Sequence, residues 1–369
     1  MNDNIHITTS ESFLHNLNSV ISSPNIEVRG SITKELVAQN IFISDPLYRC
    51  YFVKGRNDNI FSKIAETLWM LQGRDDVKWL SYYLPRAEQF SDDGVTWRGA
   101  YGPRLRRYKG FRYNVDQLSN VIKILQEDSN SRRAIISIFD PSEDMCKTKD
   151  VPCNNWLHFL MRQGKLNLHI SQRSCDILWG YSGIDTFSWS VLLQMMAYWL
   201  DLEVGYTHHF ISSLHLYERH FNRATNLLDN NKDFSDIYVK YPNIYTPYFS
   251  THFDDLDAKL WFLFDIENNS REVPDQSEFE LIKRLEDEFL EECCRMLFIY
   301  IYYNRFLEVG NSYTYNFENL GFLIHNLIPD SDFRIACIEY ITRKNNSIFK
   351  YVDLTDTEKD IFCNYYKRL

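Results

Sequence analysis

The sequence of 369 residues lacks the signatures of several common classes of protein. Its eight cysteines form no C-x-x-C pair, which argues against a zinc ribbon or a dithiol redox motif. No apolar run approaches the roughly 20 residues that a membrane-spanning helix needs. The first residues, MNDNIHITTS, lack the charged segment and the apolar stretch of a secretory signal. We therefore expect a reduced, cytoplasmic protein without a membrane partner.

An excess of positive charge is also missing, because the formal net charge is −10 at pH 7. This balance disfavours a nucleic acid as partner, although a local basic pocket can still hold one phosphate group. In contrast, hydrophobic residues make up 44% of the chain and aromatic residues 15%. The chain is therefore expected to bury a core of large side chains, in one large domain or two ordinary ones.

The pattern of apolar residues indicates a mixture of helices and strands. Helical spacing predicts helices at residues 58–80 (with a stop at Gly73), 115–128 and 186–203, the last apolar nearly all round. Alternation and β-propensity predict strands at 133–140 and 156–171, the second with a hairpin turn at Gly164-Lys165. We therefore expect a protein of the α+β class.

The composition changes after about residue 265. A polar break, NNSREVPDQ, is followed by a capping box of Ser277 and Glu280 and by one long helix towards Gly310. Thr355 and Glu358 form a second such start signal. These features place a boundary near 266–275 and predict a catalytic domain at 1–265 and a helical C-terminal extension at 266–369.

Cys153 stands in a context that favours reactivity. A lone cysteine is usually a small buried hydrophobic residue. Here Pro152 fixes the backbone before it, and Arg173 lies two predicted strands later, so its guanidinium can stabilise the nucleophilic thiolate. The chain shows neither a serine-hydrolase elbow nor a Cys-His-Asn protease signature, so a different electrophile is expected.

Several segments before and after this cysteine carry a resemblance to a known family. In chain order they read ETLWMLQGRDD, WRGAYGPRLRR, DQL, DSNSRR, VPC, LNLHISQRSCDILWG, DTFSWSVLL and SSLHLYERH. Over roughly residues 27–220 the chain resembles the thymidylate synthase family, and its pattern is closer to the nucleotide hydroxymethylases than to the housekeeping synthase. The resemblance implies a mixed β-sheet packed with helices, here with the C-terminal extension added, and a homodimer without a metal.

The resemblance also implies a mechanism. Cys153 would add to C6 of a pyrimidine nucleoside monophosphate, and C5 would then attack the one-carbon unit of 5,10-methylenetetrahydrofolate. Glu66 would organise water and proton transfer, and Tyr101 would help to remove the C5 proton. Judged without the family, a glutamate on a helix surface and a tyrosine in the core are the better interpretations.

Phosphate recognition would follow from arginine residues, because planar guanidinium groups bind a phosphate dianion with paired hydrogen bonds. Arg173 and Ser174 correspond to the family's phosphate contacts within the subunit. Arg132 and Arg133 correspond to a pair that reaches across a two-fold interface. Arg29 is a looser candidate. Judged from residue types alone, an Arg-Arg pair is more often a solvated surface patch.

The remaining contacts implied by the resemblance concern the base, the sugar and the folate. They are Gln172 and Asn154 for the base, His215 and Tyr217 for the sugar hydroxyl, and Asp176, Gly180 and Trp97 for the folate.

The chain departs from the family's pattern at informative positions. Asn154 stands where the synthase usually has histidine, and Ser213 where it usually has aspartate. WGYSGID replaces LGLPFN with one extra residue, and the following helix then places Asp185 on the family's base-reading asparagine. A carboxyl group there is expected to select cytosine. The alternative is that Asp185 caps the helix that starts at Thr186.

The family's short C-terminal tail, which closes the site, is not found in this sequence. Water is then expected to reach the exocyclic methylene intermediate, so we predict hydroxymethylation of CMP or dCMP at C5, with ribose and deoxyribose left open. Methylation of the same ring or of a uracil nucleotide is the first alternative. A non-catalytic nucleotide-binding regulator is the second. The C-terminal extension is a lid, a dimerisation element or a partner-binding module.

Overall fold

The computed structural model describes residues 4–28, 30–272, 278–310, 312 and 314–369. These residues form two compact units. The first contains residues up to Arg49 together with Ala65–Asp233, and the second contains Cys50–Ile64 together with Phe234–Leu369. Among the described helices, none combines the length and the apolar character that crossing a bilayer requires.

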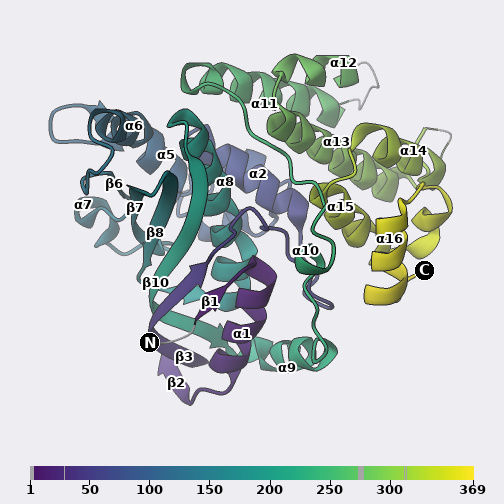
Figure 1. Cartoon of the computed structure of the whole chain (residues 1–369), viewed down its shortest axis with the longest axis horizontal. Coiled ribbons are helices and arrows are strands. Elements are labelled where there is room, and N and C mark those ends of the chain that lie inside the picture. The colour runs from purple at the N-terminus through teal and green to yellow at the C-terminus, as the bar shows by residue number, and fades with distance from the viewer. Residues whose placement is uncertain (1–3, 29, 273–277, 311, 313) are drawn as a thin grey trace. The chain divides into compact units, whose positions relative to one another are not determined.

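The first unit is built on one mixed β-sheet, in which β10 runs parallel to β8 and antiparallel to β3 (Figure 1). The sheet order is β1 (Ile5–His6), β3 (Ser31–Ile43), β10 (Glu203–Tyr217), β8 (Lys165–Gln172), β7 (Asn154–Arg162) and β6 (Ile135–Ser137). Two further strands, β2 (Asn25–Val28) and β9 (Cys175–Asp176), pair with β3 and β10, and β4 (Tyr108–Lys109) pairs with β5 (Asn114–Val115). The predicted α+β class and mixed sheet are confirmed.

The helices of the first unit are α1 (Thr9–Ile21), α3 (Val77–Leu80), α4 (Ala87–Phe90), α5 (Tyr101–Arg106), α6 (Gln117–Glu127), α7 (Pro141–Asp144), the π-helix η1 (Ile177–Asp185), α8 (Thr186–Trp199), the short 3-10 helix η2 (Glu218–His220) and α9 (Phe221–Asn230). Helices α1 and α8 pack against the sheet. Every residue of α8 from Thr186 to Ala197 is buried, which confirms the predicted central helix. Helix α2 (Ile60–Leu71) ends just before Gly73, whose φ of +75° stops the helix as predicted.

A tight hairpin joins β7 to β8. Its turn residues, Gln163 and Gly164, have φ angles of +54° and +75°, so the turn lies one residue earlier than predicted. Positive φ at both positions is typical of the two-residue turns whose twist matches that of paired strands. The pairing brings the two outer ends of the hairpin together, where Asn154 lies opposite Gln172.

The second unit is helical in its described residues. It contains α10 (Ile237–Lys240), η3 (Phe253–Asp255), α11 (Leu256–Glu272), α12 (Glu278–Ile282), η4 (Lys283–Leu285), α13 (Glu288–Val309), α14 (Phe317–Leu327), α15 (Asp332–Thr342), η5 (Asn346–Lys350), α16 (Asp356–Asp360) and the short π-helix η6 (Ile361–Tyr365). Helices α11 and α13 pack on each other (Figure 1).

The single long helix predicted towards Gly310 is wrong at its start. Glu286 adopts a left-handed conformation with φ +49° and separates the short helices α12 and η4 from α13. The next residue, Asp287, caps α13 by accepting a hydrogen bond of 2.8 Å from the Leu290 N–H. The apolar pattern continues across Glu286 and Asp287, although the cap at Asp287 starts a new helix. The pattern alone therefore does not reveal the break. Gly310 ends α13 as predicted, and Ser277 lies outside the described residues.

The predicted domain boundary near 266–275 covers the end of α11 and residues that lie outside the described part of the chain. The compact units divide the chain elsewhere, after Asp233, and residues 50–64 belong to the second unit. The division into domains at 265/266 therefore stays a prediction.

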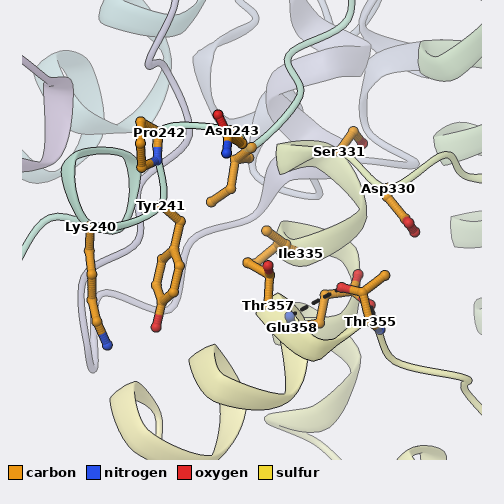
Figure 2. Close-up of a pocket in the computed structure, with 11 residues that line it drawn as sticks. Lys240, Tyr241, Pro242, Asn243, Asp330, Ser331, Ile335, Thr355, Thr357 and Glu358 are labelled. Atoms are coloured by element: carbon orange, nitrogen blue, oxygen red, sulfur yellow. Dashed lines mark hydrogen bonds between the residues drawn. The ribbon is translucent and has the colours of Figure 1, made fainter.

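A buried ion pair organises the C-terminal part of the second unit. Arg334 on α15 and Glu358 on α16 are almost fully buried, with Nε and Oε1 2.8 Å apart. Glu358 also completes the predicted capping box with Thr355, which is confirmed. Both residues of this box line a cavity of about 360 Å³ between α10, α15 and α16, where Figure 2 shows the Thr355–Glu358 hydrogen bond.

Replacing Glu358 with alanine is expected to lower the free energy of unfolding by about 3–5 kcal/mol, because the buried Arg334 guanidinium would lose the nearer and buried one of its two carboxylates and keep only the exposed Asp330 at 3.7 Å. The exposed pair of Lys359 and Asp356, 3.6 Å apart, supplies the control. Asp356→Ala should cost about 1 kcal/mol or less. Urea denaturation followed by circular dichroism measures both variants, and equal losses would contradict the stabilising role of the buried pair.

Candidate active site

Cys153 and Arg173 lie together at the open end of the β7–β8 hairpin. The Arg173 backbone N–H donates to the Cys153 carbonyl at 2.9 Å. Its guanidinium donates to the carbonyl oxygens of Pro152 at 2.9 Å and Val151 at 2.7 Å. The positive charge therefore lies against the backbone that leads into the cysteine. The predicted proximity of Arg173 to Cys153 is confirmed.

The surroundings of Cys153 favour the thiol over the thiolate. Burial raises the pKa of Cys153 to about 12, and the charge of Arg173 only partly opposes this rise. The carboxylates of Asp185 and Asp150 raise the pKa of the thiol further. A thiolate must therefore form as the thiol attacks, with a base that takes its proton.

The two carboxyl groups that act on the thiol, Asp185 and Asp150, and a third that they act on in turn, Glu66, are themselves perturbed. Burial, reinforced by the charges of Asp185 and Asp150, raises the pKa of Glu66 on α2 to about 8. Burial raises the pKa of Asp185 to about 7, although hydrogen bonds from its neighbours oppose the rise. Burial also raises the pKa of Asp150, which accepts a 2.6 Å hydrogen bond from the Trp97 indole. Groups that titrate near neutrality are suited to general acid and base catalysis.

Asp185 lies at the centre of a buried network of amide groups. One carboxylate oxygen accepts from Asn154 Nδ2 at 3.1 Å and the other from Gln172 Nε2 at 2.9 Å. Asn154 Nδ2 also donates to the Tyr101 hydroxyl at 2.7 Å. Although Asp185 directly precedes α8, its side chain makes no capping hydrogen bond. The capping alternative for Asp185 is therefore wrong.

The segment WGYSGID lies in a π-helix, and the extra residue relative to the family's pattern stays a prediction. Residues Ile177–Asp185 form η1, whose wider turns take in one more residue than an α-helix of the same length. Asp176 begins η1 by accepting hydrogen bonds from Leu178 N at 2.8 Å and Trp179 N at 3.1 Å. At the end of η1, the carboxylate of Asp185 points into the network with Asn154 and Gln172.

Gly180 allows this close approach of η1 to the network. A Cβ atom at Gly180 would lie 3.2 Å from a carboxylate oxygen of Asp185 and 3.2 Å from Cys175 Sγ. Both contacts are tighter than ordinary van der Waals packing. Packing alone therefore explains the glycine at position 180, without any contact to a ligand.

Tyr101 begins α5 and stacks on Trp189 of α8, with ring centroids 5.5 Å apart. Burial first, and then the charges of Asp185 and Cys153, raise the pKa of Tyr101 well above its ordinary value. The phenol is therefore protonated and can donate or accept a proton only in concert with a neighbour.

His215 and Tyr217 occupy the end of β10, with perpendicular rings 5.2 Å apart. In the sheet, His215 lies opposite Asp176 of β9, two residues after Ser174. Ser213 lies 3.5 Å from His215 Nδ1 and donates to Glu35 of β3. The structure therefore brings the predicted sugar contacts to the same edge as one predicted folate contact.

The remaining predicted site residues are exposed or half-buried, and one of them lies outside the residues that the structure describes. Arg132 and Arg133 are exposed directly before β6, and Trp97 is half-buried and stacked on Phe90 at 5.2 Å. Arg29 lies outside the described residues. The roles of all these residues stay predictions.

Sequence reasoning missed Asp150 and His209. Asp150 stands three residues before Cys153, and its carboxylate packs so closely on Gly99 that a Cβ there would lie 2.1 Å from an oxygen. His209 is fully buried and lies 3.3 Å from Gln172 Oε1. The position of Asp150 beside the cysteine was a usable signal. Nothing in the sequence pattern distinguishes His209 from His208.

Comparison with known families agrees with this arrangement. A family model described as Thymidylate synthase matches residues 53–259. The chain belongs to the thymidylate synthase family. The resemblance read from the sequence is thereby confirmed.

Within this family, phage proteins are among the similar relatives. Deoxyuridylate hydroxymethyltransferase of Bacillus phage SP01 is 42% identical over 197 residues, which cover 51% of this chain and 51% of the relative. The protein of that name from Delftia phage PhiW-14 is 33% identical over 204 residues, covering 52% and 55%. Thymidylate synthase of Mycoplasma genitalium is 36% identical over 137 residues, covering 37% and 44%. The chain spans about half the length of these curated relatives.

Replacing Glu66 with glutamine is expected to flatten the pH dependence of stability. The pKa of Glu66 rises from 4.5 to about 8 on folding, so the folded state holds a proton that the unfolded chain releases. Stability from this group is present below pH 4.5 and is lost as the pH rises towards 8, at up to about 1.4 kcal/mol per pH unit. Glutamine has no proton to lose.

Thermal denaturation between pH 5 and 8 measures this effect. The melting temperature of wild type should fall more steeply than that of Glu66→Gln over this interval. Glu88→Gln, at an exposed position on α4, is the control and should follow wild type. Parallel curves for wild type and Glu66→Gln would contradict the raised pKa.

Proposed function

We propose that the chain transfers a one-carbon unit to C5 of a pyrimidine nucleoside monophosphate, and that its product is the C5-hydroxymethyl derivative of CMP or dCMP. The observation that carries this proposal is the buried carboxyl group of Asp185 in a network with Asn154, Gln172 and Tyr101, beside the Cys153 thiol. Family membership supports the reaction type.

The first step is addition of Cys153 to C6 of the ring, which makes C5 a carbon nucleophile. Because the thiol is protonated in the free site, its proton must pass to a base as the bond forms. Asp185, with a pKa of about 7, is the candidate acceptor, whereas Glu66, with a pKa of about 8, holds its proton at neutral pH and is a candidate donor in later proton transfers. Tyr101 is the candidate for removal of the C5 proton.

The one-carbon unit would come from 5,10-methylenetetrahydrofolate, and Asp176, Gly180 and Trp97 are the residues proposed to hold it. Asp176 uses Oδ1 for both of its bonds to the start of η1, which leaves its second oxygen for an amino group of the pterin. The Trp97 ring offers a flat apolar surface. These residues fit a folate by their chemistry.

Asp185 would read the base by hydrogen bonding. Cytosine presents an amino donor at C4 and an acceptor at N3, so a carboxyl group accepts from the first and shares one proton with the second. A pKa of about 7 makes that proton available near neutrality. Uracil presents the reverse pattern, and opposed acceptors would cost on the order of 1–3 kcal/mol.

A uracil nucleotide is the second candidate substrate, because the phage relatives at 42% and 33% identity are named deoxyuridylate hydroxymethyltransferases. Their names favour a hydroxymethyl over a methyl product. A methyl product would need hydride from the folate and a site closed to water. A regulator that only binds nucleotides would have no use for the thiol beside Arg173.

The proposed enzyme is a homodimer in which Arg132 and Arg133 reach the phosphate site of the other subunit. Both side chains are exposed and stand directly before β6. Arg173 and Ser174 would bind the same phosphate within the subunit, and Arg29 is a further candidate. A monomeric mass by sedimentation, with and without nucleotide, would contradict the shared site.

The reaction is tested by incubating the protein with 5,10-methylenetetrahydrofolate and with CMP, dCMP, UMP or dUMP in turn. Mass spectrometry is expected to show a hydroxymethyl adduct of one cytosine nucleotide. Cys153→Ser should lose turnover by several orders of magnitude, since an alkoxide is far harder to generate at neutral pH than a thiolate. Retained release of label from C5 in Cys153→Ser would contradict the mechanism.

Asp185→Asn is expected to shift the base preference towards uracil by roughly ten- to a hundredfold in kcat/KM. Asparagine donates to O4 and accepts from N3–H, which suits uracil. Because Asp185 makes no capping bond, the start of α8 should tolerate the change. An unchanged ratio of cytosine to uracil activity would show that Asp185 does not read the base.

A further inference from the structure

A buried histidine lies at the far end of the network that holds Asp185. His209 Nδ1 lies 3.3 Å from Gln172 Oε1, and Gln172 Nε2 donates to Asp185 at 2.9 Å. All three side chains are almost fully buried. His209 itself packs edge-on against the Tyr181 ring, with centroids 5.4 Å apart. The three residues form a continuous hydrogen-bond chain within the first unit.

The surroundings of His209 select one tautomer. Burial first, and then the charge of His208, lower the pKa of His209 to about 3, so the ring is neutral. His209 Nε2 is buried without a hydrogen-bond partner among the described residues. A proton on Nε2 would be a buried donor without an acceptor, which is costly. The single N–H therefore lies on Nδ1 and points at Gln172.

This tautomer determines the orientation of the Gln172 amide. An Nδ1–H group can only donate, so it requires the amide oxygen of Gln172 on its side. The amide nitrogen is then directed at the carboxylate of Asp185. If the amide were reversed, its nitrogen would face the N–H of His209 and its oxygen would face Asp185. Two donors would then meet at one end of the amide and two acceptors at the other.

We propose that His209 is a positioning residue for base recognition, which holds the Gln172 amide as a donor to Asp185 and so keeps Asp185 presented as a hydrogen-bond acceptor. This assignment rests on the proposed function in one respect, namely that Asp185 reads the base. Without His209, both orientations of Gln172 become accessible. The reversed orientation would favour a protonated Asp185 that donates to Gln172 and is less available to the nucleotide.

Three variants separate positioning from packing. His209→Leu removes the donor, whereas His209→Asn keeps an N–H close to the position of Nδ1. His208→Leu is the matched control, because successive residues of β10 point to opposite faces and His208 contacts His169 and Phe42 instead. Leucine fills the buried space better than asparagine, so a packing role predicts the larger defect in His209→Asn.

The first measurement is the titration of Asp185 by carbon NMR, with Asp185→Asn used to assign the signal. In His209→Leu the midpoint should rise by about half a pH unit or more, because a hydrogen bond that favours the carboxylate is weakened. His209→Asn and His208→Leu should titrate as wild type. This readout needs no turnover, and an unchanged midpoint in His209→Leu overturns the positioning role even if the proposed reaction is correct.

The second measurement is the ratio of kcat/KM on cytosine and uracil nucleotides. His209→Leu should reduce this ratio by about five- to tenfold, and His209→Asn should restore it. A defect that is larger in His209→Asn than in His209→Leu overturns the assignment in favour of packing. Absence of turnover in wild type would refute the proposed function, while the NMR titration would still decide the role of His209.

Discussion

The antiparallel pairing of β7 with β8 is the constraint on which the site depends. The two strands are joined by a two-residue turn, so their outer ends must meet, and these ends carry Cys153 and Arg173. Gln172 and Asn154 lie opposite each other in the same pairing and supply the two amide donors to Asp185. A shift of one strand by one residue would turn its side chains to the opposite face, so Asn154 and Gln172 would no longer lie opposite each other and point to the same face. The thiol, the Arg173 guanidinium and the two amides that donate to Asp185 are therefore positioned by one hairpin.

Burial of several acids in one place gives the site its chemical character. Asp150 and Asp185 raise the pKa values of Glu66 and of the Cys153 thiol, whereas Arg173 lowers the pKa of the thiol and, with Arg104, that of Asp150. The free protein therefore holds protons that a reaction at neutral pH can move. The same arrangement costs stability, because each raised pKa means that the ionised acid is disfavoured in the folded chain. Such a cost is typical of sites where function, rather than folding, selects the residues.

The segment that leads to Asp185 is wound as a π-helix, and Gly180 lets that helix approach the carboxylate of Asp185 and Cys175 closely. The proposed reading of the base by Asp185 would favour a cytosine nucleotide, whereas the phage relatives are named deoxyuridylate hydroxymethyltransferases. The preference for one base over the other would depend on the protonation and orientation of a few buried groups. Asp185, Gln172 and His209 form the chain that controls both.

The sequence by itself determined the α+β class, the β7–β8 hairpin, the buried helix α8, and the family, because local periodicity and short motifs carry that information. It also placed Arg173 near Cys153. It failed where an apolar pattern ran through a local cap, as at Asp287, and where segments distant in the sequence meet. Only the tertiary structure showed that Asp185 accepts from two amides instead of capping α8, and that Asp150 and His209 belong to the site. Burial and hydrogen-bond partners determine the pKa and the tautomer of a side chain. Burial and hydrogen bonding exist only in the folded chain.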